Sequence, residues 1–143
     1  MIATIDLFSG AGGLSLGAIN AGLDVRLNVD TDAVACATLR ANSDIHRGTV
    51  VEADVGILQG DELRELSGIS ATEDVIVIGG APCQPFSKNS YWTDPGDDSK
   101  YRQARAHGYV LPKPSPITEG KPDIRRTLVD EYWRHVKQTN AIG

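Results

Sequence analysis

Residues 1–80 alternate short apolar runs with segments of helical periodicity, and this alternation limits the possible folds more than any other feature of the chain. Strands that alternate with helices form parallel sheets covered by helices. The last run, Val75–Ile78, is continuously apolar and β-branched, which is typical of a central strand buried on both faces. The sequence therefore predicts an α/β fold with a doubly wound parallel sheet. The predicted strands are Ala3–Phe8, Val25–Val29, Thr49–Ala53 and Val75–Ile78, and the predicted helices are Gly13–Ala21, Asp32–Ala41 and Asp61–Leu66.

The pattern breaks at Ser87, and five of the seven prolines lie between Pro95 and Pro122. A connection of this length is unusual in a compact domain unless it is a lid, a binding loop or a disordered segment, so the sequence predicts a long mobile loop at about 88–122. Helical periodicity returns at Asp123–Gln138. We expect that helix to bury one apolar face, formed by Leu128, Val129, Tyr132, Trp133 and Val136.

Composition excludes several classes of protein. No run approaches the roughly 18 apolar residues of a membrane span, and the amino terminus has no signal-peptide pattern, so we expect a cytoplasmic protein without membrane contact. Two cysteines without a nearby His/Cys cluster predict neither a disulfide framework nor a metal site. Residues 1–87 carry 4 basic and 12 acidic side chains, whereas residues 88–143 carry 10 and 7. The second part could face a polyanion or form an ordinary solvated loop.

A glycine-rich turn, Ser9–Gly13, follows the first strand and opens a helix. Such turns bring the backbone close to a ligand. Ser15 stands where a dinucleotide fingerprint has its third glycine, which disfavours a dinucleotide and leaves adenosine without a pyrophosphate open. A tight turn without a ligand is the alternative.

Carboxylates follow the second and third strands. Asp30 comes 24 residues after Asp6, at a place where two acceptor oxygens can bind ribose hydroxyls. Asp30, Thr31 or Asp32 could instead cap the following helix, and both functions are compatible if Asp32 is the cap. Asp54 ends the third strand, so ligand-capable groups meet at the carboxyl edge of the predicted sheet.

The segment Gly79–Ser87 places Cys83 directly after the fourth strand. Two glycines and two prolines fix an irregular turn there, which would be costly to keep for packing alone, so Cys83 is the predicted nucleophile. Cys36 lies among alanines on a packed helix, and we expect it to be a buried structural cysteine.

These segments together resemble the carbon-5 cytosine-specific DNA methyltransferases that use S-adenosylmethionine. The resemblance rests on Asp6 to Gly17, Asp30, Asp54 with Val55, and above all Pro82 to Ser87. It covers the first 87 residues and resumes at Arg126–Leu128.

The resemblance implies a role for each matching residue. Phe8 would stack on adenine, Asp30 would hold the ribose hydroxyls, and Cys83 would be the catalytic thiolate that attacks an extruded base. Gln84 to Ser87 would begin a catalytic loop, with Gln84 and Ser87 binding the substrate. The implied cofactor-binding residues are Phe8, Ser9, Gly10, Gly12, Gly13, Asp30, Thr31, Asp54, Val55, Pro82 and Leu128.

The family's Glu-Asn-Val element, expected on the next strand, and its target-recognition domain are absent from the 143 residues. We therefore expect the amino-terminal part of a catalytic domain, inactive alone, whether as a shortened chain, a degenerate gene product or one subunit of a split enzyme with a second chain. Double-stranded DNA is the implied substrate. A tRNA methyltransferase of the same family and a catalytically silent S-adenosylmethionine-binding module are the alternatives.

Overall fold

The computed structural model describes residues 1–82, 103–110, 112 and 127–143. The chain divides into two units, Met1–Pro82 with Thr127–Gly143, and Cys83–Arg126, and each is described by itself. In the second unit, residues 103–106 form one helical turn, after which the Tyr109 amide donates to the Ala104 carbonyl at 2.9 Å. All the features below belong to the first unit.

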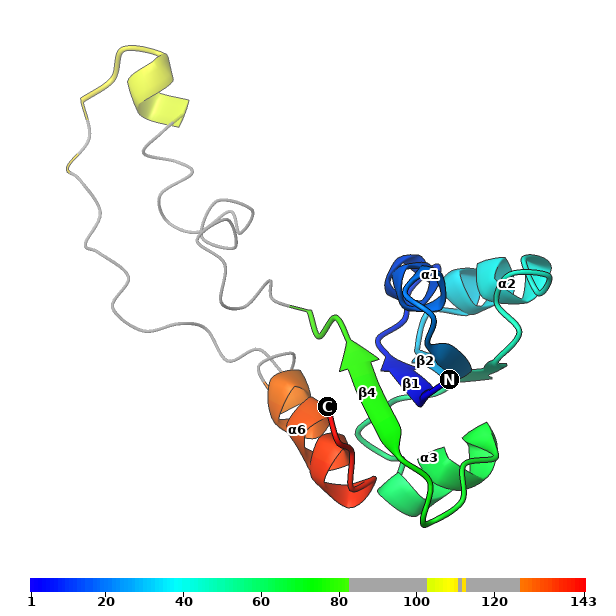
Figure 1. The fold of residues 1–143 in the computed structure, drawn as a ribbon. Coiled ribbons are helices and arrows are strands. Elements are labelled where there is room, and N and C mark those ends of the chain that lie inside the picture. The colour runs from blue at the N-terminus through cyan, green and yellow to red at the C-terminus, as the bar shows by residue number, and fades with distance from the viewer. Residues whose placement is uncertain (83–102, 111, 113–126) are drawn as a thin grey trace. The chain divides into compact units, whose positions relative to one another are not determined.

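The first unit contains a four-stranded parallel sheet with the strand order β3-β2-β1-β4 (Figure 1). β1 forms the middle of the sheet together with β2, and all five of its residues are buried. The four predicted strands are confirmed, with ends that differ by at most one residue. Their bounds are β1 (Ala3–Leu7), β2 (Asp24–Asp30), β3 (Thr49–Glu52) and β4 (Val75–Gly79).

The predicted central position of the fourth strand is wrong for the described sheet, because β4 pairs with β1 only and is its last strand. Its other edge carries two backbone hydrogen bonds from the end of the chain. The Ile142 amide donates to the Val75 carbonyl, and the Val77 amide donates to the Gly143 carbonyl, both at 2.9 Å. An apolar, β-branched sequence reports burial of the two faces of a strand, and it does not report how many neighbours the strand has.

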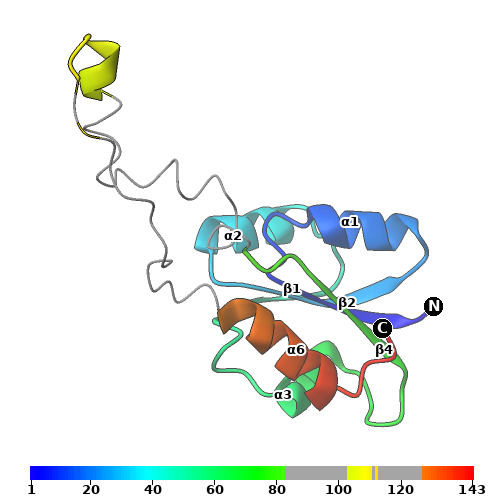
Figure 2. The same cartoon turned by 90° about the vertical axis from the view of Figure 1, so that its left-hand side faces the viewer.

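Helices cover both faces of the sheet, which confirms the doubly wound arrangement. Figure 2 shows α1 and α2 on one face and α3 and α6 on the other. The core between these layers contains Ile5, Leu7, Leu27 and Leu63, each 0% exposed. The helices are α1 (Gly13–Asn20), α2 (Ala33–Ala41), α3 (Gly60–Ser67) and α6 (Leu128–Gln138).

The buried face of α6 differs from the predicted one. Tyr132 and Val136 pack against the core as expected, but Val129 and Trp133 are 37% and 56% exposed. His135, in contrast, is fully buried. The helix lies against the loop after β3, and the main-chain carbonyls of that loop need hydrogen-bond donors. Polar side chains of α6 supply them from buried positions, which an apolar sequence pattern cannot reveal.

No helix in the described part of the chain is long and apolar enough to cross a membrane.

Candidate active site

The carboxyl ends of the four parallel strands bring most of the predicted site segments to one edge of the sheet. Leu7 pairs with Val29 on one side and with Gly79 on the other, so the turn after β1 lies between the ends of β2 and β4. Asp30, at the end of β2, pairs with Glu52 at the end of β3. Open α/β sheets bind their ligands at this edge.

The turn after β1 has an unusual backbone. Phe8 has φ 58°, a left-handed conformation that is rare for a bulky residue, and Gly10 and Gly12 have φ 52° and 91°. The Phe8 ring is half-buried, and a side chain at Gly10 would meet nothing within 4 Å. Strained backbone of this kind is concentrated at functional sites. The turn therefore offers open space beside a fixed aromatic ring, which fits an adenosine ligand.

Contacts with β2 and with the region of α2 hold this turn in place. The Ser9 amide and hydroxyl both donate to the Val29 carbonyl, at 3.1 and 3.3 Å, so the Ser9 side chain is buried and bound to β2. Gly12 lies so close to Leu39 and His46 that a Cβ would approach their atoms to 2.5 and 2.7 Å. Sequence reasoning missed His46, since no local pattern connects it with the turn.

The Asp30 carboxylate connects the turn to α2. Its Oδ2 accepts from the Gly10 amide at 2.7 Å, and its Oδ1 accepts from the Asp32 amide at 2.9 Å. Asp32 is the N-cap of α2, and its Oδ1 accepts from the Val34 amide at 2.8 Å. Asp32 is therefore the cap that the sequence left open among Asp30, Thr31 and Asp32. Because a carboxylate has about four acceptor positions, Asp30 keeps capacity for ribose hydroxyls.

The other predicted cofactor residues differ in exposure. Asp54 is exposed, and its Oδ1 accepts from the Gly56 amide at 2.8 Å. The Val55 side chain is 3% exposed and belongs to the core, so a ligand in the position of adenine would meet its main chain. Thr31 and Gly13 are exposed, and Pro82 and Leu128 are half-buried. Cys83, Gln84 and Ser87 lie outside the described residues.

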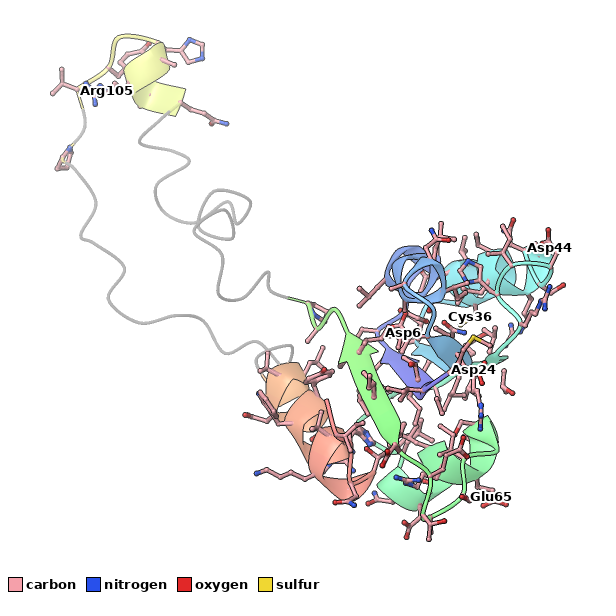
Figure 3. The ribbon with its side chains drawn as sticks, viewed as in Figure 1. Asp6, Asp24, Cys36, Asp44, Glu65 and Arg105 are labelled. Carbon is pink, nitrogen blue, oxygen red and sulfur yellow. The ribbon has the colours of Figure 1, made fainter. Side chains whose placement is uncertain are left out.

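A buried polar cluster lies beneath the turn, where Asp6 of β1 faces α1 (Figure 3). Ser15 Oγ lies 2.6 Å from Asp6 Oδ2 and 2.5 Å from Asn28 Oδ1, and all three residues are 0% exposed. A hydroxyl has one proton, so it cannot donate to both oxygens. Two arrangements resolve this: a protonated Asp6 that donates to Ser15, which then donates to Asn28, or an Asn28 amide turned so that its Nδ2 donates to Ser15 and Ser15 donates to Asp6.

The pKa of Asp6 favours the protonated arrangement only below about pH 6. Burial raises it from 3.8 to about 6, against the opposing effect of the Ser15 hydrogen bonds. Among the described residues, Asp6 Oδ1 and Asn28 Nδ2 have no hydrogen-bond partner. Sequence reasoning missed this cluster, although the serine in place of a third glycine was its visible signal.

Cys36 is a buried structural cysteine, as predicted (Figure 3). It is 0% exposed, and its thiol lies 3.6 Å from the Asp30 carbonyl oxygen. Burial raises the pKa of the thiol, which keeps it protonated and unreactive.

The chain matches the model of the family described as "C-5 cytosine-specific DNA methylase" over residues 2–102. Among curated proteins, it is 51% identical over 83 residues to the type II methyltransferase M.XorII of Xanthomonas oryzae pv. oryzae, covering 58% of this chain and 19% of the relative. It is 36% identical over 147 residues to the type II methyltransferase M.SacI of Streptomyces achromogenes, covering 94% of this chain and 32% of the relative.

A solved structure shares the fold. A prophage-encoded Escherichia coli protein, assigned as a DNA modification methyltransferase, superposes with a TM-score of 0.62 at 27% identity. The superposition covers 99% of this chain and 30% of that protein. The 143 residues thus span about a third or less of the length of these three relatives.

Proposed function

Because the chain belongs to the C-5 cytosine-specific DNA methylase family, we propose that it carries the cofactor site and the nucleophile of a DNA (cytosine-5-)-methyltransferase. The observation that supports this most is the contact between the Gly10 amide and the Asp30 carboxylate, 2.7 Å long, beside the strained Phe8. This part of the sheet edge combines backbone that a ligand can approach closely, an aromatic ring and carboxylate oxygens that can accept further hydrogen bonds. These are the groups that an adenosine moiety needs.

S-adenosylmethionine is the proposed cofactor, and it supplies an electrophilic methyl group. Asp30 binds the ribose hydroxyls, Phe8 stacks on the adenine ring, and the backbone at Gly10 leaves room for the methionine part. Thr31, Asp54 and Val55 lie toward the adenine side of the same edge, and Pro82 and Leu128 complete the cofactor contacts.

Cys83 is the proposed nucleophile. Its thiolate adds to carbon 6 of cytosine, forming a C–S bond and turning carbon 5 into an enamine-like nucleophile that takes the methyl group. A base then removes the carbon-5 proton, the ring double bond reforms, and the C–S bond breaks. In the sequence, Cys83 comes four residues after Gly79, the last residue of β4.

The cytosine must leave the DNA stack to reach a thiolate at the sheet edge, which costs roughly a few kcal/mol. We propose that the basic residues between Lys88 and Arg126, together with Gln84 and Ser87, bind the DNA and help to offset that cost. Double-stranded DNA is therefore the proposed substrate, and the bacterial cytoplasm is the proposed location.

We further propose that methyl transfer requires polypeptide beyond these 143 residues, present either in the same chain or as a second chain. This rests on the length of the relatives and on β4, whose outer edge pairs with no further strand among the described residues.

The test is transfer of a labelled methyl group from S-adenosylmethionine by the complete methyltransferase that contains this chain. Duplex DNA should become labelled at carbon 5 of cytosine, and tRNA should not. Labelling of tRNA alone would assign the enzyme to the other substrate. Binding of S-adenosylmethionine without transfer to either nucleic acid would identify a silent binding module.

A further inference from the structure

Two side chains of α6 bind the main chain of the loop that follows β3. His135 Nε2 lies 2.7 Å from the Val55 carbonyl oxygen, and Arg134 Nη2 donates to the same oxygen at 3.0 Å. Arg134 Nη1 donates to the Leu58 carbonyl, also at 3.0 Å. Three contacts from adjacent residues thus hold the loop at two carbonyls that are three residues apart. We call these contacts the Val55 clamp.

Both donors of the clamp are held in place. His135 is 0% exposed, and because a carbonyl only accepts, its Nε2 carries the proton. The Arg134 guanidinium is fixed by Glu131 Oε2 at 2.7 Å and by Gln138 Oε1 at 2.8 Å. A clamp with pre-oriented donors loses little conformational entropy when it binds the loop.

The clamp acts where the proposed cofactor contact is. The Val55 side chain belongs to the core, whereas the neighbouring Asp54 is exposed. Gly56 is bound to the Asp54 side chain, and the Ile57 amide donates to the Asp54 carbonyl at 3.1 Å. The loop is therefore a tight turn whose position depends on the group that holds the Val55 carbonyl.

We propose that Arg134 and His135 are positioning residues that set the Asp54–Val55 main chain for the adenine of S-adenosylmethionine. The inference rests on the proposed function and adds a role for α6 in cofactor affinity. Neither residue touches the cofactor. Both act through the Val55 carbonyl. Without their hydrogen bonds this carbonyl would be a buried acceptor without a partner, which is energetically unfavourable.

The test compares three variants of the complete methyltransferase that contains this chain. His135→Phe removes one of the two donors to the Val55 carbonyl and leaves Arg134, and His135→Gln returns a donor near the position of Nε2. Tyr132→Phe is the matched control, because it removes a 2.8 Å hydrogen bond from the same helix to the Val77 carbonyl on β4. Calorimetry gives the Kd for S-adenosylhomocysteine, and hydrogen exchange gives the protection of the Gly56 and Ile57 amides.

His135→Phe should raise the Kd roughly five- to tenfold and accelerate exchange at Gly56 and Ile57. His135→Gln should restore most of both values, and Tyr132→Phe should change the Kd less than about twofold. If His135→Phe is insoluble, three other variants decide in the same way: His135→Gln, Arg134→Met and Lys137→Met. A loss of S-adenosylhomocysteine affinity and of amide protection is then expected only for Arg134→Met.

Two negative results are distinguishable. No S-adenosylhomocysteine binding by the unchanged complete enzyme would contradict the proposed function and, with it, the cofactor role of the clamp. Binding by the unchanged enzyme, with the same Kd and the same amide exchange in His135→Phe, would contradict the clamp alone. An equal loss of S-adenosylhomocysteine affinity in Tyr132→Phe and His135→Phe would mean that both residues only stabilise the packing of α6, which would contradict the clamp.

Discussion

The Gly10 amide donates to Oδ2 of Asp30 at 2.7 Å, and this single contact ties the turn after β1 to the end of β2. The other oxygen of Asp30 accepts from the Asp32 amide at 2.9 Å. One carboxylate therefore orders the backbone on both sides of the proposed ribose position, so that ligand binding and local order depend on the same residue.

Asp30→Ala should weaken S-adenosylmethionine and S-adenosylhomocysteine alike, because both contain the ribose. We expect a loss of roughly ten- to a hundredfold, since hydrogen bonds to a charged acceptor contribute roughly 1.5–3 kcal/mol each and water replaces part of them. Calorimetry measures the Kd. Asp32→Ala is the matched control, because it removes the α2 cap and leaves affinity nearly unchanged. Unchanged affinity in Asp30→Ala would limit Asp30 to a structural role.

Gly12→Ala should destabilise the fold by at least about 2 kcal/mol, through the positive φ and the collision with Leu39 and His46. Gly13→Ala should instead be neutral or stabilising by about 0.5 kcal/mol, because Gly13 is helical, exposed and free of contacts within 4 Å. Chemical denaturation measures both. Equal effects at the two positions would mean that Gly12 does not approach α2 as described.

Stability should fall as the pH rises through the pKa of Asp6. The folded value, about 6, exceeds the ordinary value of 3.8, so the folded chain binds more protons between these pH values. The stabilising contribution is complete below about pH 4 and is lost above about pH 6, and it amounts to roughly 1–3 kcal/mol.

Asp6→Asn should remove this dependence, since an amide donates to Ser15 at every pH. His135, whose pKa is lowered mainly by burial, has the opposite effect below pH 6.5 in both proteins. The difference between wild type and Asp6→Asn therefore isolates Asp6. Denaturation at about pH 4, 5, 6 and 7 measures it, and a difference that does not change with pH would exclude a shared proton in the cluster.

We expect the 143-residue chain to self-associate, because the Trp133 indole is 56% exposed on α6, the helix that packs beside β4. Trp133→Ser should reduce this association without lowering stability by more than about 1 kcal/mol. Sedimentation velocity at several concentrations measures association. If the variant associates as strongly as wild type, the contact surface lies elsewhere, with the outer edge of β4 as the next candidate.

The sequence predicted the strands and the turn, and it named Asp32 among the candidate caps of α2, because each depends on local signals. Apolar runs bounded by turn residues define strands, and parallel strands bring their carboxyl ends to one edge. Asp30 could be placed at this edge of the sheet because it lies at the carboxyl end of β2, and no knowledge of the residues that it contacts was needed.

The remaining features depend on contacts between distant segments. Ser15 and Asn28 are 13 residues apart, and His135 is 80 residues from the carbonyl that it binds. Trp133 belonged to the predicted buried face because apolar periodicity cannot recognise that a neighbouring loop needs hydrogen-bond donors. The position of β4 as the last described strand has the same origin, since burial of a strand's faces says nothing about its edges.

The most direct test of the central claim uses duplex DNA with 5-fluorocytosine at the target, S-adenosylmethionine and the complete methyltransferase that contains this chain. Fluorine cannot leave as a cation, so after methyl transfer the protein remains bound to carbon 6 through sulfur. We predict a denaturant-resistant protein–DNA adduct in wild type and in Cys36→Ser, attached at Cys83 by mass spectrometry, and none in Cys83→Ser. An adduct of equal yield in Cys83→Ser, or one that disappears in Cys36→Ser, would contradict the assignment of Cys83 as the nucleophile.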